Sequence, residues 1–227
     1  MNDIGQARRP PSGGRLALIL AAERLIAQRG LTGVSLREIN EAAGLKNVSA
    51  AHYHFGSRDG VVEAILAYRL PDIQARRVKL LADLQDAGRQ SDPRGLISAL
   101  VWPLVEEIKP RREGNYYLRF IEQIKRERGD SPLISYGNAI THTWARILNE
   151  LRAQIKEIPP QISTFRLRLE FVRIVSSLAT VENWIEHGEM SPADLPLAGE
   201  VVIDAAVSAI VSPPTPEALA HLRGLDG

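Results

Sequence analysis

The stretch SLREINEAAGLKNVSAAHYHFGSRDG, residues 35–60, decides the fold of this 227-residue chain. Ser35 and Glu38 have the spacing of a capping box, which predicts that a helix begins there. Gly44 is expected to end that helix, and a second short helix is expected between Gly44 and Gly56. Two short helices joined by a glycine turn are the layout of a helix-turn-helix unit, whose second helix enters the major groove of DNA.

A longer helix is expected to precede this unit. From Leu18 onward, apolar residues recur at the three-and-four-residue spacing of an amphipathic helix, and Gly30 is expected to end it. Residues 1–14 are rich in arginine, proline and glycine and have too few apolar groups to fold, so they are expected to be a flexible basic arm. The helix-turn-helix domain is therefore predicted to cover residues 15–60.

The last short helix of this unit is expected to have distinct inner and outer faces. Val48, Ala51 and Phe55 fall on one side of the helix and are predicted to point inward. Small and hydrogen-bonding groups then point outward, as suits a helix that reads a groove. The outward residues are Ser49, Ala50 and Tyr53, flanked by His52 and His54. A three-helix packing unit without a nucleic-acid role is the alternative on layout alone.

The rest of the chain is also predicted to be helical, because no segment shows sustained period-two alternation. An N-cap residue followed by proline marks three later helix starts, at Asp92-Pro93, Ser131-Pro132 and Ser191-Pro192. The expected helices cover residues 57–88, 93–109, 113–128, 132–157, 162–187 and 194–211. The first of them is expected to bend or break near Pro71. The fold class is thus all-α, with a larger C-terminal helical domain at 61–211 and a loose, proline-rich tail at 212–227.

The last two of these helices predict a contact between subunits. The penultimate helix has one apolar stripe at Leu167, Phe171, Ile174, Leu178, Val181 and Ile185. A second stripe runs through Phe165, Leu169, Val172, Ser176 and Ala179. A surface helix needs one buried stripe, so two stripes indicate burial on both sides. We expect a homodimer whose interface lies within residues 162–211; a large monomeric bundle is the alternative.

Charge and composition limit the classes of function. Lys+Arg 28 and Asp+Glu 27 leave a formal charge of +1, but the first sixty residues carry about +3 and the remainder about −2, which favours a local anion-binding surface. The absence of cysteine excludes disulfides and thiolate metal sites. The longest uncharged apolar run, Leu96–Val105, is shorter than the ~18 residues of a membrane span. We expect a cytoplasmic protein with no membrane segment.

Residues 15–66 resemble the DNA-binding domain of TetR-type transcriptional regulators. The matching positions are Ala22, Gly30, Ser35, Arg37-Glu38-Ile39, Ala43-Gly44, Tyr53-His54-Phe55 and Ser57-Arg58-Asp59. Three departures bear on the base contacts. Asn40 stands where the family usually has alanine, and Ala51 stands where leucine is usual. The segment from Gly44 to Phe55 is also one residue longer than usual, so His52 takes the position most often held by tyrosine.

The resemblance implies a homodimeric repressor that binds a near-palindromic operator and is released by a small-molecule effector. The residues implied in DNA binding are Ser35, Arg37, Lys46, Asn47, Ser49, Ala50, His52, Tyr53, His54 and Arg58. Backbone phosphates are the expected target of Ser35, Arg37, Tyr53, His54 and Arg58. Base edges are the expected target of Lys46, Asn47, Ser49 and Ala50. For Asn47 a capping role is equally open, and Arg58 can instead be a solvated cation at a helix start.

The effector is expected to bind among aromatic and polar residues in the middle of the chain. The candidates are Trp102, Glu106, Tyr117, Phe120, His142 and Trp144, each of which can instead be an ordinary core residue. No metal site is expected, because His52 and His54 lie about 200° apart on a helix. No cofactor or enzyme motif is present in the sequence. The alternatives to a regulator are a helical protein-binding adaptor and an enzyme with an unrecognised site.

Overall fold

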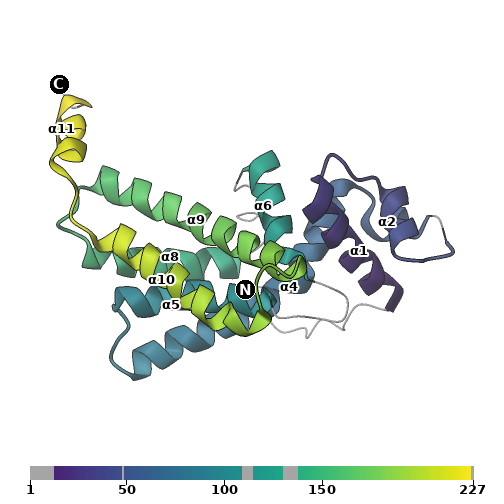
Figure 1. The fold of residues 1–227 in the computed structure, drawn as a ribbon, viewed down its shortest axis with the longest axis horizontal. Helices are drawn as coiled ribbons and strands as arrows, with labels where there is room; N and C mark the ends of the chain where they lie inside the picture. The colour runs from purple at the N-terminus through teal and green to yellow at the C-terminus, as the bar shows by residue number, and fades with distance from the viewer. Residues whose placement is uncertain (1–12, 48, 109–114, 130–137, 226–227) are drawn as a thin grey trace.

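The structure, a computed structural model, describes residues 13–47, 49–108, 115–129 and 138–225 (Figure 1). Within these ranges every regular element is a helix, which confirms the all-α prediction. The helices are α1 (Gly13–Arg29), α2 (Leu36–Ala42), α3 (Ala50–Phe55), α4 (Arg58–Asp86), α5 (Pro93–Val105), η1 (Glu106–Ile108), α6 (Tyr117–Arg128), α8 (Asn138–Gln154), α9 (Pro160–Glu186), η2 (Pro192–Asp194), α10 (Leu195–Val211) and α11 (Pro216–Leu225).

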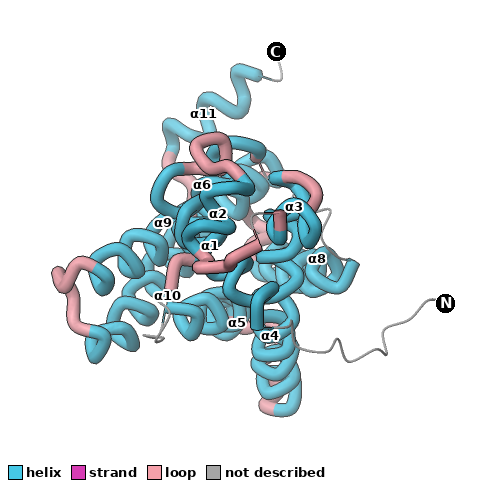
Figure 2. The backbone as a smooth tube through the Cα atoms, turned by 90° about the vertical axis from the view of Figure 1, so that its right-hand side faces the viewer, coloured by secondary structure: helices cyan, strands magenta, loops and turns pink. Residues whose placement is uncertain are grey.

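Helices α1, α2 and α3, with the start of α4, form a small domain at one end of the molecule, which we call the head (Figures 1 and 2). Its core contains Leu18, Ile26, Ile39, Ala51 and Phe55, all less than one-tenth exposed. A glycine with a positive φ angle follows the end of each of its three helices. These glycines are Gly30 (φ 78°), Gly44 (φ 67°) and Gly56 (φ 70°). The left-handed region disfavours residues with a Cβ, which explains why glycine stands at these helix ends.

Helix α4 runs from the head into the second domain, which we call the bundle. At 29 residues it is about 43 Å long. It continues through Pro71 without a break, so of the two predicted outcomes a break there is wrong. Arg69 and Ile73, on either side of the proline, are both buried, and this packing offsets the hydrogen bond that the proline cannot donate.

The bundle consists of the C-terminal part of α4 with α5, η1, α6, α8, α9 and α10, and α5 packs against α4, η1, α8, α9 and α10. Helix α5 lies between α4 and α10, and α9 packs against both α10 and α6. Its core includes Leu100, Phe120, Ile147, Leu178 and Ile203, each at most 4% exposed. Helix α6 also packs against α1, so the bundle and the head share a contact besides the continuous α4.

Both ends of the chain are more helical than expected. Helix α1 begins at Gly13, so Gly13 and Gly14 do not belong to the predicted flexible arm; residues 1–12 of that arm lie outside the described residues. The tail predicted to be loose contains α11. Thr215 caps this helix by accepting the N–H of Ala218 at 3.3 Å, and Pro216 stands at its first position.

Among the described residues, no single helix is long and apolar enough to cross a bilayer. The pair Pro192–Val211 and Pro216–Leu222, bent by 55°, meets the requirement by length and composition only.

Candidate nucleic-acid interface

The turn between α2 and α3 is held by Asn40, which is only 2% exposed. Its Nδ2 donates to the carbonyl of Asn47 at 2.6 Å, and its Oδ1 accepts the N–H of Ala51 at 2.9 Å. One side chain of α2 therefore fixes both the turn and the first residues of α3. In the sequence Asn40 stands out only as a departure from the family. A polar residue beside the apolar Ile39 in a short helix was nevertheless a signal that its side chain hydrogen-bonds within the fold.

Helix α3 presents fewer residues to solvent than expected. Tyr53 is 85% exposed, and His52 and His54 are also exposed, as predicted. Ala50 is only 8% exposed, so its predicted outward position is wrong. The helix begins at Ala50 itself, and the turn that Asn40 holds brings this first residue against α2. Ala51 and Phe55 point inward as predicted, whereas Val48 lies outside the described residues.

Lys46 and Asn47 are exposed in the turn before α3. The Oδ1 of Asn47 accepts the N–H of Ser49 at 3.0 Å, and its backbone carbonyl accepts the N–H of Ala50 at 3.2 Å. Of the two roles left open for Asn47, the structure supports capping. Ser49 occupies the N-cap position with an exposed side chain that makes no cap hydrogen bond, so its hydroxyl is accessible at the mouth of the helix.

The other residues implied in DNA binding already have partners within the head. Ser35 makes the predicted capping box, with its Oγ accepting the N–H of Glu38 at 3.2 Å and its own N–H donating to Glu38 at 2.8 Å. Arg37 pairs with Glu41 at 3.0 Å, one helical turn away, and both side chains are exposed. The Nε of Arg58 donates to the carbonyl of Val34 at 2.8 Å, which ties the start of α4 to the loop before α2.

Glu38 has an unusual acidity for a side chain of the head surface. Hydrogen bonds from the hydroxyl and N–H of Ser35, followed by a hydrogen bond from Arg29 at 2.8 Å, lower the pKa of the Glu38 carboxyl to about 2. The ionised carboxylate is the form that accepts these bonds. The capping box is therefore complete throughout the neutral and mildly acidic range.

A comparison with known families decides what the head is. Residues 18–65 match the family model of bacterial regulatory proteins, tetR family. The matched residues run from α1 through the Asn40 turn and α3 to the start of α4. The head therefore resembles the DNA-binding domain of the TetR family.

Curated HTH-type transcriptional regulators are similar to part of the chain. The repressor KstR2 of Rhodococcus jostii is 34% identical over 97 residues, which is 43% of this chain and 44% of that protein. The regulator BetI of Burkholderia thailandensis is 35% identical over 75 residues, 33% of this chain and 38% of that protein. The chain thus aligns with less than half of the length of these relatives.

Solved structures extend the TetR-family likeness to the whole fold. A TetR-family transcriptional regulator from Rhodococcus sp. has a TM-score of 0.51 at 22% identity and covers 87% of this chain and 100% of that one. PfmR from Thermus thermophilus has a TM-score of 0.51 at 15% identity, over 91% of this chain and 99% of that one. At these identities the likeness concerns the fold alone.

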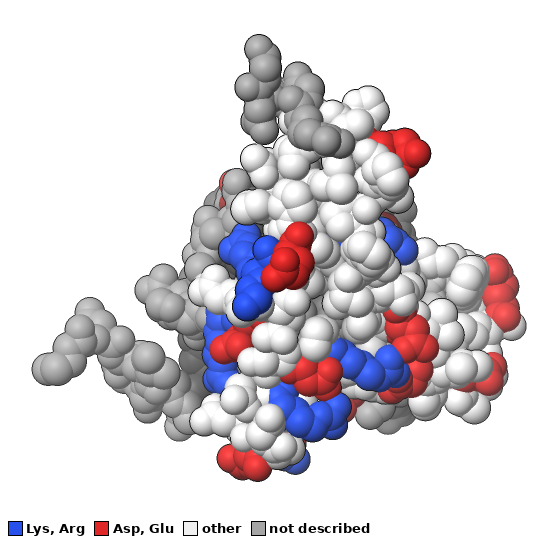
Figure 3. All heavy atoms as spheres, turned by 90° about the vertical axis from the view of Figure 1, so that its left-hand side faces the viewer, with Lys and Arg blue, Asp and Glu red and all other residues white. Residues whose placement is uncertain are grey.

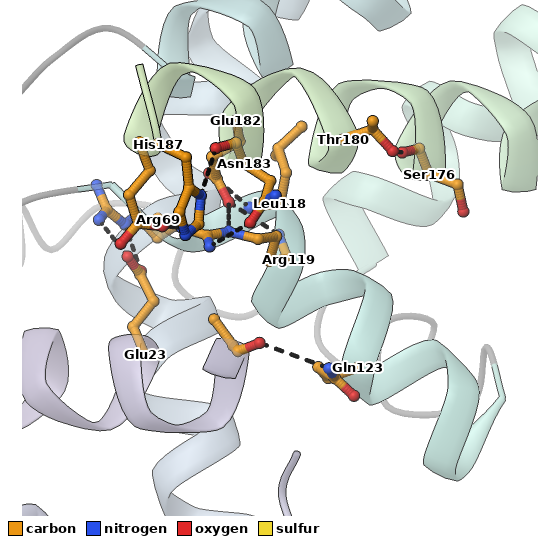
Figure 4. Close-up of polar contacts among 12 residues, drawn as sticks. Glu23, Arg69, Leu118, Arg119, Gln123, Ser176, Thr180, Glu182, Asn183 and His187 are labelled. Carbon is orange, nitrogen blue, oxygen red and sulfur yellow. Dashed lines mark hydrogen bonds and ion pairs between the residues drawn. The ribbon is translucent and has the colours of Figure 1, made fainter. Parts of the chain in front are cut away.

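The TetR-type head is joined to the bundle by a buried ion cluster (Figure 4). Arg69 of α4 donates to both carboxylate oxygens of Glu23 in α1, each at 2.7 Å, and to Glu107 in η1 at 3.2 Å. All three side chains are at most 2% exposed. Removing one partner of a buried pair leaves an uncompensated charge, so this cluster holds α1, α4 and η1 in one arrangement.

Helix α6 forms the second connection. Its Glu127 accepts the N–H groups of Leu31 and Thr32, in the loop between α1 and α2, at 2.8 and 3.2 Å. At the other end of α6, Glu182 from α9 accepts the N–H groups of Leu118 and Arg119 at 3.1 and 3.0 Å (Figure 4). The two carboxylates therefore link α9 to the head through a single helix.

Glu182 is held in an environment that favours its neutral form. Burial raises the pKa of the Glu182 carboxyl to about 7, although the N–H groups of Arg119 and Leu118 and the Arg119 guanidinium act in the opposite direction. The Arg119 Nε lies 3.2 Å from the Glu182 carboxylate. The cap on α6 thus contains a group that changes its charge near neutral pH.

The predicted effector residues Trp102, Glu106, Tyr117 and Phe120 line neither of the two cavities described below. Tyr117 and Phe120 are core residues whose rings lie 6.3 Å apart, and Glu106 pairs with Arg76. Trp102 packs against α10, because a Cβ on Gly199 would lie 3.1 Å from its ring. The side chains of His142 and Trp144 lie outside the described residues.

Two cavities can be described. A groove of about 480 Å³ between α9 and α10 is lined mostly by apolar residues, among them Trp184, Met190 and Val201, together with polar residues such as Glu170 and Arg173. A cavity of only about 10 Å³, room for one water molecule, lies between α5, α8, α9 and α10 and is lined by apolar residues and Glu170. The location of the effector stays a prediction.

Proposed function

We propose that this chain is a DNA-binding transcriptional regulator that represses its target as a homodimer and is released by a small-molecule effector. The observation that carries the proposal is a TetR-type head whose α3 exposes Tyr53, His52 and His54 beside the accessible Ser49 and Lys46. A helix with hydrogen-bonding groups on its free face suits the major groove. The relative KstR2 is a transcriptional repressor.

Dimerisation follows from the apolar face of α9 and α10. Phe165, Leu169 and Val172 of α9, together with Leu197 and Val201 of α10, are between 45% and 68% exposed. Phe165, Leu169 and Val172 belong to the second apolar stripe of α9, which we expect from the sequence to be covered by another subunit. An exposed apolar surface of this kind is what a helical interface between two copies would bury.

Two heads are needed because each α3 is only six residues long and reaches a single half-site. The operator is therefore proposed to be a near-palindrome whose half-site centres lie about one helical turn apart, or a small multiple of it. The buried Arg69 cluster and the Glu127 contact would set the position of each head on the bundle. An effector that shifts α6 or α4 would alter the distance between the heads.

A gel shift with the DNA upstream of the chain's own coding region tests the proposal. We expect a saturable complex that unlabelled specific DNA competes away and unrelated DNA does not. Tyr53→Ala should weaken this complex at least tenfold, whereas Val78→Ala, an exposed apolar residue of α4 outside the head, should leave it unchanged. An adaptor or an enzyme would give no sequence-dependent complex, and that result would overturn the proposal.

A further inference from the structure

Helix α11 projects from the end of the molecule opposite the head (Figures 1 and 2). It follows α10 after a short connection with the sequence SPPT, residues 212–215. Its apolar residues Ala218, Leu219 and Leu222 are not among those packed against the hydrophobic core. Among the described residues, helix α11 thus lies outside the hydrophobic core, with these three side chains partly buried.

A helix of ten residues needs support from packing. Isolated helices shorter than about 12–15 residues are marginal in water, even when their ends are capped. Thr215, Pro216 and Glu217 give α11 a favourable start, but this contributes only to its first turn. Ala218 and Leu222 lie four residues apart and Leu219 and Leu222 three apart, so the helix has one apolar side. That side is suited to dock on another surface.

The direction in which α11 leaves the bundle is fixed by Arg166 of α9. Its guanidinium donates to the carbonyl of Ile210 at 3.4 Å, to that of Pro213 at 3.5 Å and also to that of Ser212. Two consecutive prolines, Pro213 and Pro214, further restrict the backbone of the connection. The helix is thus held out in a defined direction.

A matching apolar surface lies at the same end of the molecule. Phe165, Leu169 and Val172, on the N-terminal half of α9, are 68%, 58% and 45% exposed; we call them the α9 patch. Arg168 is exposed between them, and Glu217 is exposed at the start of α11, so the two surfaces carry opposite charges. Figure 3, which views this end, shows a largely uncharged upper part, with charged side chains gathered lower down.

We propose that α11 of one protomer docks on the α9 patch of a second copy, so that the two C-terminal helices are exchanged across the dimer and cover this part of the α9–α10 face, while Leu197 and Val201 meet the helices of the partner. The inference rests on the proposed homodimer. Both heads must approach the same side of a DNA duplex, so the two-fold axis runs along the long axis of the molecule. Such an axis brings the two α11 ends together at the pole opposite the DNA, next to the α9 patch of each copy.

Cross-linking of the full chain tests the exchange, because the protein has no cysteine of its own. In the double variant Leu169→Cys/Leu222→Cys, docking between copies should give a disulfide-linked dimer on a non-reducing gel after mild oxidation. A disulfide forms only when the two Cα atoms lie within about 7 Å. The single variants should stay unlinked, and so should Leu169→Cys/Ala220→Cys, since Ala220, two residues from Leu222, is exposed on the other side of α11.

Sedimentation separates the failure of this proposal from the failure of the dimer. If the protein sediments as a dimer but the disulfide forms within one chain, α11 folds onto its own α9. If it sediments as a dimer and no disulfide forms, α11 docks elsewhere. Both results overturn the exchange but keep the dimer. A monomer at micromolar concentration overturns both proposals. Leu222→Ala should raise the dimer dissociation constant at least about tenfold, while His221→Ala leaves it unchanged. Equal dissociation constants for Leu222→Ala and the unmodified chain would contradict the exchange.

Discussion

The carboxylate of Glu127 in α6 accepts the backbone N–H of Leu31 at 2.8 Å, across a sequence separation of 96 residues. The same carboxylate accepts the N–H of Thr32 at 3.2 Å. Beside it stands Gly30, whose φ is 78° and where an added Cβ would lie 2.4 Å from the Glu127 Oε1. The loop that separates α1 from the helix-turn-helix is therefore held by the bundle and not by the head alone.

Glu127→Ala should lower the free energy of unfolding by about 1–2 kcal/mol, because the N–H groups of Leu31 and Thr32 lose a charged acceptor. Urea unfolding measures this change. Glu122→Ala, on the same helix but away from the loop, is the control and should cost less than about 0.5 kcal/mol. Equal effects of the two substitutions would mean that the contact contributes nothing specific.

Gly30→Ala should cost more than an ordinary surface substitution, by about 1–3 kcal/mol. The positive φ is unfavourable for alanine, and the new Cβ would displace the Glu127 carboxylate. In the Glu127→Ala background the clash is gone and only the backbone strain remains. We therefore expect a smaller cost for Gly30→Ala in that background; a full double-mutant cycle measures the difference, and an additive result would contradict the contact.

Asn40→Ala should lower the free energy of unfolding by about 2–4 kcal/mol. It leaves the buried N–H of Ala51 and the carbonyl of Asn47 without their partner. Asn40→Asp keeps the acceptor for Ala51 but replaces the donor with a buried carboxyl oxygen facing the Asn47 carbonyl, so its effect should differ from that of alanine. Amide hydrogen exchange at Ala51 reports the loss directly: exchange should accelerate in Asn40→Ala, and unchanged exchange would show that α3 is positioned by other contacts.

Acid should expose the contribution of the capping box. The Glu38 carboxyl has a folded-state pKa of about 2, below its ordinary value of 4.5. The unfolded chain therefore binds a proton first, and the stability that Glu38 provides is present above pH 4.5 and lost as the pH falls towards 2. The melting temperature of Glu38→Gln, compared with that of the unmodified chain from pH 6 to pH 2.5, should differ most at the upper end. A constant difference across this range would contradict the assignment.

Glu182 should make the folded chain less stable as the pH rises through neutrality, which is opposite in sign to the effect of Glu38. Its folded-state pKa is raised to about 7, so the folded chain binds the proton more tightly than the unfolded chain does. The stability associated with protonated Glu182 is present below pH 4.5 and lost as the pH rises through 7. Glu182→Gln, which stays neutral, should remove this part of the pH dependence. If both proteins lost stability equally between pH 5 and 8, the buried carboxyl would not be the cause.

Local patterns predicted the head well because its elements are encoded by neighbouring residues. The Ser35 capping box and the glycines at 30, 44 and 56 appear in the structure as helix start and helix ends. The same reasoning could have found α11, since Thr215-Pro216 repeats the pattern of an N-cap followed by proline. The burial of Ala50 could not be predicted in this way, because it depends on a tertiary hydrogen bond from Asn40 to the turn. Contacts such as Glu127 to Leu31 are set by packing of distant helices, which local periodicity does not encode.

Specificity for the operator should depend more on Lys46 than on Asn47. The Asn47 side chain already accepts the N–H of Ser49 at 3.0 Å, and the buried Ala50 is withdrawn from the groove. Lys46 is exposed in the same turn and can address guanine, where a well-placed contact is worth about 1–3 kcal/mol of discrimination. Binding-site selection should therefore show a relaxed preference at one or two symmetric positions for Lys46→Ala. Asn47→Ala should keep the selected motif and lower the melting temperature, as loss of a cap does. A changed motif for Asn47→Ala, with folding intact, would mean that its amide leaves Ser49 to pair with a base.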